Sequence, residues 1–500
     1  MSPNLFGILD YPADVEDGLR RMNPWWEGQP LRPLPEFRRW AFEICLQRLK
    51  TGLAPAILLR GPRQVGKTTI QEQLIEYLLH AEHVDPRRIL RLQFDDLPSL
   101  GGVREPVLAL SRWFESRILG KTFNEAAREQ KPAFLFFDEV QNLDKWSIQL
   151  KSLVDVSSVR VLVTGSSALR MELGEDSLAG RVSGLDLGPL HLREVAELRH
   201  GERIEGALPL NGHGALGEID FWLGLRDLEP ERREIRDRAF RDFSHRGGYP
   251  RAQERADRPW EEIADHLNEA VIERALKHDL RIGSRGRKRD GALLEEVFRL
   301  ACRYAGQCPA QALYVREIHE ALDANVGWGR IRAYLEFLEA TLLLRLVRPL
   351  EIRLKKKKGS YKLALCDTAL RAAWLGEVVP LDPEGLGAAP HLSDIASHLA
   401  ESVLGYFLSG IPNLDVAHFP ERPVEPEVDL VLTVGERRIP IEVKYRRRID
   451  SQRDTRGLRA FLEKTVYNAP FGVLVTLEDG VEVRDPRIVA LPLSSVLLLR

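Results

Sequence analysis

The stretch Gly61-Pro62-Arg63-Gln64-Val65-Gly66-Lys67-Thr68 decides the fold of the first half of the chain. It matches the pattern G-x-x-x-x-G-K-[ST], follows an apolar run at residues 56–59 and precedes a helical pattern at residues 69–80. Glycines let such a loop turn tightly, so that backbone N–H groups and the helix N-terminus surround phosphate groups. The spacing therefore predicts a nucleotide site in which Lys67 reaches the β- and γ-phosphates and Thr68 ligates Mg²⁺.

A second apolar run supplies the acidic partner of this loop. Residues 134–137 are Phe-Leu-Phe-Phe, and Asp138 and Glu139 follow them. We expect Asp138 to hold the magnesium ion and Glu139 to orient or deprotonate the attacking water, whereas an acidic strand end that faces solvent is the alternative. A third run, at residues 159–164, ends in small polar residues, and Ser166 or Thr164 is placed to sense the γ-phosphate. ATP hydrolysis is thus predicted, with these nucleotide contacts: Gly61, Gln64, Val65, Gly66, Lys67, Thr68, Thr69, Asp138 and Ser166.

Between residues 56 and 198, apolar runs alternate with helical patterns, and a further run lies at residues 89–94. This alternation predicts a parallel sheet with helices on its faces. Residues 201–280 are helical in pattern and heavily charged. Residues 291–370 show three helical patterns and then a hairpin, which is the element order of a winged helix. Gly and Pro are frequent at residues 376–390, which indicates a linker. A helix, a hairpin, a helix and a strand are predicted after it.

Three stretches resemble one known family. GPRQVGKTT, FFDEVQN and VTGSSALRMELGEDSLAGRVSGLDLGPLHLREV are similar to the AAA_14 type of bacterial and archaeal ATPase, over roughly residues 50–475. The family implies an AAA-type ATPase core, a helical lid and a C-terminal region called DUF4143. The arginine of its "LAGR" motif is Arg181 here, which implies an arginine finger for the γ-phosphate of a neighbouring subunit. An exposed arginine paired with a nearby carboxylate such as Asp186 is the alternative.

The family's C-terminal region resembles the PD-(D/E)XK nuclease fold, and the residues of that fold have counterparts here. Asp429 begins one strand of the predicted hairpin, while Glu442 and Lys444 share a face of the other strand. Together with Glu401 on the preceding helix, Asp429 and Glu442 imply a hard-oxygen site for Mg²⁺ or Mn²⁺. Lys444 would position or activate the water that attacks a phosphodiester. An exposed edge hairpin and a degenerate, non-cutting member of the fold are the alternatives.

Three basic clusters interrupt a chain that is otherwise nearly neutral. One lies at residues 281–289, one follows the nuclease-like hairpin with Arg446 and Arg447, and one lies on the predicted wing. The wing cluster consists of Arg353, Lys355, Lys356, Lys357 and Lys358. Charge runs are usually solvated loops, but each of these lies in or beside a module expected to touch DNA. We therefore predict phosphate contacts, and hence salt-sensitive and largely sequence-independent DNA binding.

The composition fits a soluble globular chain of several domains. Of its 500 residues 44% are hydrophobic and 29% are charged, and 72 basic against 74 acidic residues give a net charge of −2, which excludes a uniformly basic nucleic-acid coat. The four cysteines show no metal-ligand spacing, as in a reducing cytoplasm. No signal-peptide pattern opens the chain, and no apolar run approaches the ~20 residues that span a bilayer. A cytoplasmic location without a membrane segment is expected.

These features predict an α/β chain with five parts. They are an N-terminal extension (residues 1–50), an AAA-type P-loop ATPase core (51–200), a helical lid (201–285), a winged helix (286–375) and a PD-(D/E)XK nuclease-like domain (390–500). The predicted cofactors are ATP and Mg²⁺, with Mg²⁺ or Mn²⁺ at the nuclease-like site. The predicted partners are DNA and further copies of the chain, in a ring for which a hexamer is one option.

The predicted function is ATP-dependent DNA processing, in which an oligomeric ATPase is coupled to binding, remodelling and metal-dependent cleavage of DNA, with branched or junction DNA as the candidate substrate. One alternative is an ATP-dependent DNA-binding motor or switch with an inactive nuclease fold. The other alternative is a signalling or defence ATPase whose terminal domain recognises a protein partner.

Overall fold

The computed structural model describes residues 13–96, 103–143, 145–166, 178–209, 212–277, 290–351, 360–421 and 425–500. The chain divides into two compact units, Met1–Leu187 and Gly188–Arg500, which are described separately here. Within the described ranges, no helix combines the length and the apolar character needed to cross a membrane.

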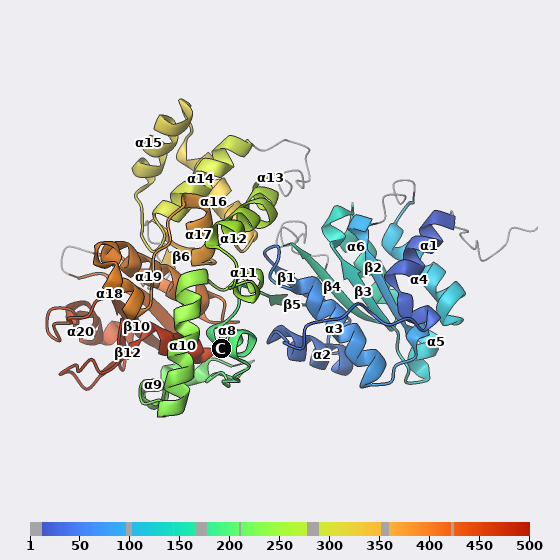
Figure 1. Cartoon of the computed structure of the whole chain (residues 1–500), viewed down its shortest axis with the longest axis horizontal. Coiled ribbons are helices and arrows are strands. Elements are labelled where there is room, and N and C mark those ends of the chain that lie inside the picture. The colour runs from blue at the N-terminus through green and yellow to red at the C-terminus, as the bar shows by residue number, and fades with distance from the viewer. Residues whose placement is uncertain are drawn as a thin grey trace, which may run out of the picture. The chain divides into compact units, whose positions relative to one another are not determined.

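A five-stranded parallel sheet forms the centre of the N-terminal unit (Figure 1). Its order is β2-β3-β4-β1-β5. The strands are β1 (Ala56–Gly61), β2 (Ile89–Gln93), β3 (Phe134–Asp138), β4 (Arg160–Ser166) and β5 (Val182–Asp186). The sequence predicted the first four and missed β5. Because all four pairings are parallel, the carboxyl ends of β1, β3 and β4 meet at one edge of the sheet.

Helices cover this sheet and bury its apolar residues. They are α1 (Ala13–Met22), α2 (Ala41–Thr51), α3 (Lys67–His80), α4 (Pro106–Phe114), α5 (Phe123–Arg128) and α6 (Trp146–Val156). Helix α3 contacts β1, β4 and α2, while α4 packs against α6. Strands β1 and β3 are apolar and buried along most of their length, as expected for a parallel sheet that is covered on both faces.

The N-terminal segment closes the edge of the sheet at β2. Asn23 donates from Nδ2 to the carbonyl of Arg91 over 2.9 Å and accepts from the Arg91 N–H over 2.6 Å. The indole N–H groups of Trp25 and Trp26 both donate to the carbonyl of Ile89. These contacts satisfy backbone groups that an edge strand would otherwise expose. The extension is therefore an integral part of the N-terminal unit.

A seven-stranded mixed sheet organises the C-terminal unit, in the order β12-β11-β10-β9-β8-β6-β7. The strands are β6 (Leu344–Pro349), β7 (Lys362–Leu365), β8 (Asp415–Phe419), β9 (Val428–Val434), β10 (Arg437–Lys444), β11 (Gly472–Thr476) and β12 (Ile488–Pro492). β9 and β10 form the predicted antiparallel hairpin, in which Ile441 pairs with Leu430. β10, β11 and β12 run parallel to one another. Helices α19 (Ser393–Ser409) and α20 (Arg456–Leu462) both contact the sheet.

Three helices and a hairpin precede this sheet in the predicted order. They are α14 (Gly291–Arg303), α15 (Gln311–Leu322) and α16 (Trp328–Ala340), followed by the antiparallel pair β6 and β7. The hairpin does not stand apart as a separate wing, because β6 also pairs with β8 through Arg348–Ala417 and Pro349–His418. The hairpin is therefore part of the C-terminal sheet, and the description of this segment as a winged helix stays a prediction.

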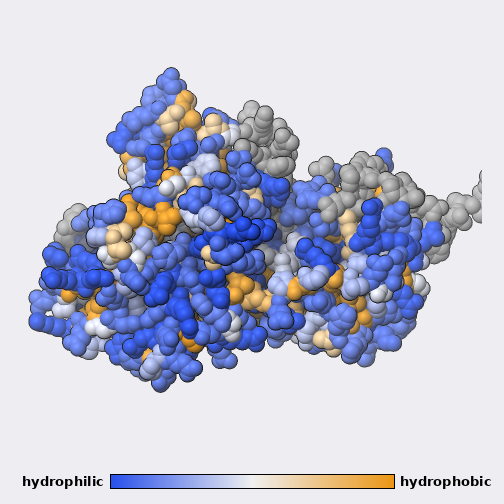
Figure 2. Space-filling view, viewed as in Figure 1, coloured by the Kyte–Doolittle hydropathy of each residue, from blue (hydrophilic) through white to orange (hydrophobic). Residues whose placement is uncertain are grey.

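The helices expected to form a lid belong to the C-terminal unit. They are α8 (Leu192–His200), α9 (Ile219–Arg226), α10 (Pro230–Arg246), α11 (Pro250–Glu254), α12 (Trp260–Leu267) and α13 (Arg274–Lys277). Helix α10 packs against α8, α17 (Thr368–Leu375) and α21 (Leu493–Val496), while its outer side is strongly hydrophilic (Figure 2). This helical segment is thus packed against the C-terminal sheet and its flanking helices.

The expectation of a linker at residues 376–390 is wrong. This segment contains α18 (Pro383–Ala388), and Asp382 before it is only 3% exposed. Asp382 caps the helix through the Gly385 N–H and accepts a 2.6 Å bond from the Ser244 hydroxyl. The proline occupies the first helical position, where its missing N–H costs nothing. The Gly and Pro residues of this segment therefore belong to the start of helix α18, which lies in a packed region.

Candidate functional site

The loop between β1 and α3 has the backbone geometry of a phosphate cradle. Gly66 has φ = +95°, which a residue with a Cβ rarely adopts, and Gln64 has φ = +63°. A Cβ at Gly61 would collide with the carbonyl oxygen of Leu187. Helix α3 begins directly after Gly66, which occupies the N-cap position and has no side chain to cap the first N–H groups. Those N–H groups and the helix dipole therefore face the loop, which favours an anion.

Lys67 lies at the centre of this cradle. Its side chain is buried, and Nζ donates to the carbonyl oxygens of Gly61 over 2.9 Å and of Pro62 over 2.8 Å. Arg39 braces the loop from outside by donating to the Val65 carbonyl over 2.5 Å. The loop therefore holds a positive charge at the position where the sequence predicted contact with the β- and γ-phosphates.

A hydrogen-bond network joins the predicted magnesium residues. Thr68 Oγ1 donates to Asp138 Oδ2 over 2.8 Å, and the Thr164 hydroxyl donates to the other carboxylate oxygen, Oδ1. Asp138 is 1% exposed and Thr164 is fully buried. Of the two predicted sensor residues, Thr164 thus contacts the acidic residue directly, while Ser166 is the last residue of β4. Thr69 lies in the first turn of α3.

Glu139 has an unusual backbone conformation for a charged residue. Its φ is +53°, and its N–H donates to Asp138 Oδ1 over 3.1 Å. Its carboxylate accepts a hydrogen bond from the side-chain amide of Gln141. Non-glycine residues in the left-handed region are uncommon and cluster at functional sites. The role of Glu139 in orienting water stays a prediction.

These residues fit ATP and Mg²⁺. The glycine cradle, the Lys67 ammonium and the glycine at the helix N-cap suit the phosphates. The hydroxyl of Thr68 and the carboxylate of Asp138 are hard-oxygen groups that suit magnesium. The bound metal would neutralise charge that develops on the phosphates during transfer. Glu139 would then accept a proton from the attacking water, while Thr164 holds Asp138 in place.

Arg181 lies just before β5 and makes an ion pair within its own chain. Its Nε binds Asp155 on α6, and its NH1 donates to the Ala179 carbonyl over 3.2 Å. The alternative partner Asp186 pairs with Arg60 instead. Because the Arg181 and Asp155 side chains are 34% and 36% exposed, this pair is weakly held. A role for Arg181 in a neighbouring subunit stays a prediction.

The C-terminal unit brings the nuclease-like residues together. Asp429 on β9 accepts a 2.9 Å hydrogen bond from the Val443 N–H of β10. On the same strand, Lys444 Nζ donates to Glu442 Oε1 over 2.6 Å. Glu401 projects from α19 and shares a hydrogen-bond donor with Asp429. The four residues that the sequence named thus form one carboxylate site.

The shared donor is Lys362, which sequence reasoning missed. Its Nζ lies 2.6 Å from Glu401 Oε2 and 3.0 Å from Asp429 Oδ1, and the side chain is 3% exposed. Lys362 begins β7, a strand that is otherwise apolar and was assigned to the wing. A lone lysine in an apolar strand was the available signal, because such a residue requires an anionic partner when it is buried.

The pKa values of the ionisable groups in this site are shifted from their ordinary values. Burial raises the pKa of Glu442 to about 8, and the neighbouring Asp429 adds to the effect. Burial also opposes ionisation of Asp429, yet the Lys362 ammonium and the Val443 N–H hold its pKa below the ordinary value. Burial raises the pKa of Glu401. For Lys362, burial is outweighed by Asp429 and Glu401, which raise its pKa. Asp429 and Lys362 therefore form a charged pair at neutral pH.

The predicted divalent-metal site does not fit this arrangement. All three of its carboxylates already bind an ammonium group: Glu401 and Asp429 share that of Lys362, and Glu442 binds that of Lys444. Within the part of the chain that the structure describes, no group of three or more His, Cys, Asp or Glu side chains is arranged to hold a metal ion. The sequence pattern identified the acidic residues but not the cation that lies among them.

The predicted DNA-binding arginines lie at the surface and are paired. Arg446 binds Asp454 over 2.5 Å, and Arg447 lies 3.3 Å from Glu478. Their side chains are 45% and 61% exposed, so both remain accessible to phosphate. The wing cluster, Arg353 and Lys355–Lys358, lies outside the described residues.

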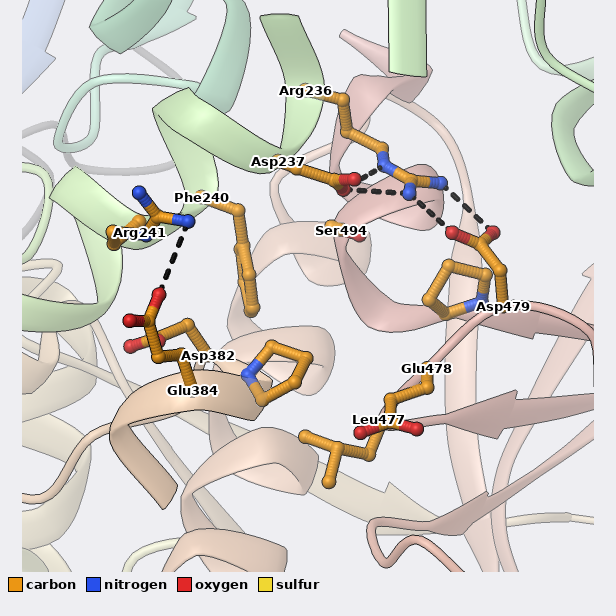
Figure 3. A pocket seen from close by; sticks show the side chains of 12 residues that line it. Arg236, Asp237, Phe240, Arg241, Asp382, Glu384, Leu477, Glu478, Asp479 and Ser494 are labelled. Carbon is orange, nitrogen blue, oxygen red and sulfur yellow. Dashed lines mark hydrogen bonds and ion pairs between the residues drawn. The ribbon is translucent and has the colours of Figure 1, made fainter. Parts of the chain in front are cut away.

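A polar pocket of about 280 Å³ lies between α10 and the ends of β11 and β12 (Figure 3). Arg236 is 1% exposed and binds Asp479 through both terminal nitrogens, and it also donates to Ser495 over 2.7 Å. Arg241 lies 3.2 Å from Glu384 on the opposite side. These charged side chains pair with one another, and the ion pair between Arg236 and Asp479 joins α10 to the segment that follows β11.

Comparison with known proteins gives three family matches. The AAA domain model AAA_14 matches residues 54–196. Two models described as domains of unknown function, DUF8612 and DUF4143, match residues 237–378 and 408–496. The uncharacterized protein MJ1637 of Methanocaldococcus jannaschii is 32% identical over 174 residues, which are 34% of this chain and 34% of that protein. The match spans about a third of the length of this relative.

Two solved structures match this chain with low sequence identity and low TM-scores. The Walker-type ATPase PABY2304 of Pyrococcus abyssi is 17% identical with a TM-score of 0.36, covering 69% of this chain and 99% of that chain. The ORC1 protein of Aeropyrum pernix, solved in complex with DNA, is 15% identical with a TM-score of 0.27, covering 69% of this chain and 94% of that chain.

The parallel sheet, the phosphate cradle after β1 and the acidic pair after β3 define an AAA-type P-loop ATPase domain. Matches to AAA_14 and DUF4143 within one chain confirm the resemblance seen in its motifs. One match to each of these two models in the same chain is consistent with an AAA_14/DUF4143 ATP-binding protein.

Proposed function

We propose that this chain is an ATP-hydrolysing, DNA-binding switch that acts as a homo-oligomer and remodels DNA without cutting it. The observation that carries the ATPase part is the network of Thr68, Asp138 and Thr164 beside the Lys67 cradle. This network supports the proposal because groups suited to phosphate, magnesium and water lie together at one edge of the sheet. Measured release of phosphate from ATP, with and without DNA, tests this part.

DNA binding is supported by the basic clusters. Arg446 and Arg447 are exposed, and their surface ion pairs are weak enough to be exchanged for phosphate contacts. Lys355–Lys358 add four consecutive positive charges to the same half of the chain. Phosphate contacts of this kind predict binding that weakens steeply with salt.

The salt dependence of DNA binding tests this assignment. Replacing Lys355–Lys358 by Gln should flatten the log–log salt slope by about 0.9 for each phosphate that the variant no longer neutralises. Lys121→Gln serves as the control, because Lys121 is an exposed lysine of the N-terminal unit that pairs with Glu129. An unchanged slope in the fourfold variant would remove this segment from the DNA interface.

Metal-dependent cleavage, with Asp429, Glu442 and Lys444 in catalytic roles, is the alternative to this non-cutting switch. The Lys362 contacts favour the non-cutting form, because they occupy carboxylates that a metal would need. Labelled linear, single-stranded and four-way-junction DNA, incubated with Mg²⁺ or Mn²⁺, separates the two forms. Cleavage that is lost in Glu442→Ala and retained in Lys67→Ala would establish the cutting form.

An oligomer follows if Arg181 completes the site of a neighbouring subunit. Arg181 can leave Asp155 at little cost, because that pair is exposed. In a mixture, an Arg181→Ala subunit still offers an intact nucleotide site, and a Lys67→Ala subunit still offers Arg181. Hydrolysis restored by mixing these two inactive variants would support action in trans. No restoration would assign Arg181 to its own chain.

Stimulation of ATP hydrolysis by DNA separates this proposal from the protein-partner alternative. A DNA-binding switch couples its nucleotide cycle to DNA, so its turnover should rise when DNA is added. Turnover that is unchanged by linear, single-stranded and junction DNA would favour a signalling or defence ATPase.

A further inference from the structure

We propose that the ammonium group of Lys362 is the resident cation of the C-terminal carboxylate site and takes the place of a divalent metal. The inference deepens the proposed function and rests on the nuclease-like domain in it, but it does not depend on DNA binding. It assigns a role to a residue on β7, well outside the hairpin that carries the acidic pattern.

The position of Lys362 is that of a bridging ion. Its Nζ lies 2.6 Å from Glu401 Oε2 on α19 and 3.0 Å from Asp429 Oδ1 on β9. The Lys362 side chain is 3% exposed, and each carboxylate side chain is 12% exposed. Charge-assisted bonds of this length in a buried site are strong, and removal of one partner leaves uncompensated charge.

Two of the other carboxylate oxygens that a hard divalent cation would use already accept a hydrogen bond. Asp429 Oδ2 accepts the Val443 N–H over 2.9 Å, and Glu442 Oε1 accepts Lys444 Nζ over 2.6 Å. Glu442 Oε2 is buried and has no hydrogen-bond partner among the described residues. Magnesium and manganese sites take about six oxygen ligands, several of them from water. A metal at this site would therefore have to displace Lys362.

Electrostatics oppose that displacement. A divalent ion placed near the Lys362 ammonium would meet a like charge inside a site of low polarity, where repulsion is poorly screened. Displacement of Lys362 would leave its charged side chain without a partner in β7, all four residues of which are buried. The lysine thus holds the site in a metal-free form.

Lys362 also connects two parts of the C-terminal unit. β7 belongs to the hairpin that follows the three helices α14, α15 and α16, whereas Glu401 and Asp429 belong to the nuclease-like part. The site therefore contains a contact within the chain, between Lys362 and the two carboxylates, where a metal would hold a scissile phosphate. The three-helix segment is therefore fixed to the sheet through this charged contact.

Titration of nucleotide-free full-length protein with Mn²⁺, followed by the EPR signal of the free ion, tests the inference. The wild type and Asp429→Asn should bind the same number of Mn²⁺ ions, because Asp429 binds no metal in the wild type. Lys362→Met, which removes the charge but keeps most of the apolar side chain, should gain one equivalent. Lys362→Met/Asp429→Asn should lose it again. An unchanged circular dichroism spectrum and unchanged resistance of the C-terminal unit to proteolysis show that each variant is folded.

A second measurement uses the wild type alone and does not depend on the folding of Lys362→Met. Acetylation by an amine-reactive reagent, read by mass spectrometry, should leave Lys362 protected, and millimolar Mn²⁺ should not change this protection. Asp429-dependent Mn²⁺ binding by the wild type would overturn the inference, as would Lys362 labelling that rises with Mn²⁺ or a folded Lys362→Met that binds no metal. Neither assay contains DNA, so failure of this inference can be distinguished from failure of the proposed DNA binding.

Discussion

Thr68 on α3 donates a 2.8 Å hydrogen bond to Asp138 at the end of β3, although β4 lies between β1 and β3 in the sheet. Thr164 on that intervening strand donates to the other oxygen of the same carboxylate. The order of the strands thus brings the start of α3 and the end of β4 to the Asp138 carboxylate at the end of β3. This relationship places the magnesium residues beside the phosphate cradle.

Lys67→Ala should abolish ATP hydrolysis. The substitution removes the buried ammonium that the loop holds through Gly61 and Pro62, and with it the charge that stabilises the transferring phosphate. We expect a loss of turnover of at least about 100-fold in a phosphate-release assay. Lys50→Ala, which alters an exposed lysine paired with Glu82, should retain wild-type turnover. Full activity in Lys67→Ala would refute the assignment.

Thr164→Val should impair the site through Asp138. Valine matches the shape of threonine but cannot donate a hydrogen bond to the carboxylate. Loss of a residue that orients a metal ligand costs about 10- to 100-fold in activity or metal affinity. The Mg²⁺ concentration for half-maximal turnover should rise more than KM for ATP. Thr51→Val, at the exposed end of α2, is the matched control, and equal behaviour of the two variants would contradict this role.

Asp367 should make stability depend on pH. It is buried and accepts hydrogen bonds from the N–H groups of Gly248 and Ala369, but burial raises its pKa from 3.8 to about 7. Because the folded pKa is the higher one, its contribution to stability is full below pH 3.8 and is lost as pH rises through 7.

The wild type should therefore lose stability relative to Asp367→Asn across that window. Urea midpoints of both proteins, measured at several pH values, give this difference. The exposed control Asp415→Asn should follow the wild type. A difference between wild type and Asp367→Asn that does not vary with pH would show that burial does not perturb this carboxyl group.

Arg236→Met should destabilise the C-terminal unit. The substitution removes a buried guanidinium and leaves Asp479 and Ser495 without their partner. Breaking a buried pair costs about 3–5 kcal/mol, and the 30% exposure of Asp479 places this case near the lower value. Arg241→Met breaks the exposed pair with Glu384 and should cost less than about 1 kcal/mol in the free energy of unfolding. Equal losses in urea denaturation would show that Arg236 is no anchor.

The sequence predicted the elements that have strong local patterns. The apolar runs of β1 to β4 and the phosphate loop were identified because they are continuous and adjacent in sequence. β5 was missed, since its residues Val182–Asp186 include a glycine and are half-buried. The linker at residues 376–390 was mispredicted because its glycines and prolines start a packed helix, which only tertiary contacts reveal.

The carboxylate site was predictable only in part. The alternation of Glu442 and Lys444 along one strand and the acidic start of its partner strand follow from local spacing. Lys362 lies 39 residues before Glu401 and 67 before Asp429, on a hairpin with its own pattern. Its role depends on the pairing of β6 with β8, which joins the hairpin to the sheet and which no local signal specifies.

Glu139→Gln provides the most direct test of the central claim, that this chain hydrolyses ATP at the site beside Lys67. Glutamine keeps the size of the side chain but cannot accept a proton from water. ATP affinity by fluorescent-nucleotide binding and turnover by phosphate release should be measured on the same preparation. We predict wild-type affinity with turnover reduced by at least about 100-fold. Unchanged turnover in Glu139→Gln would contradict the account.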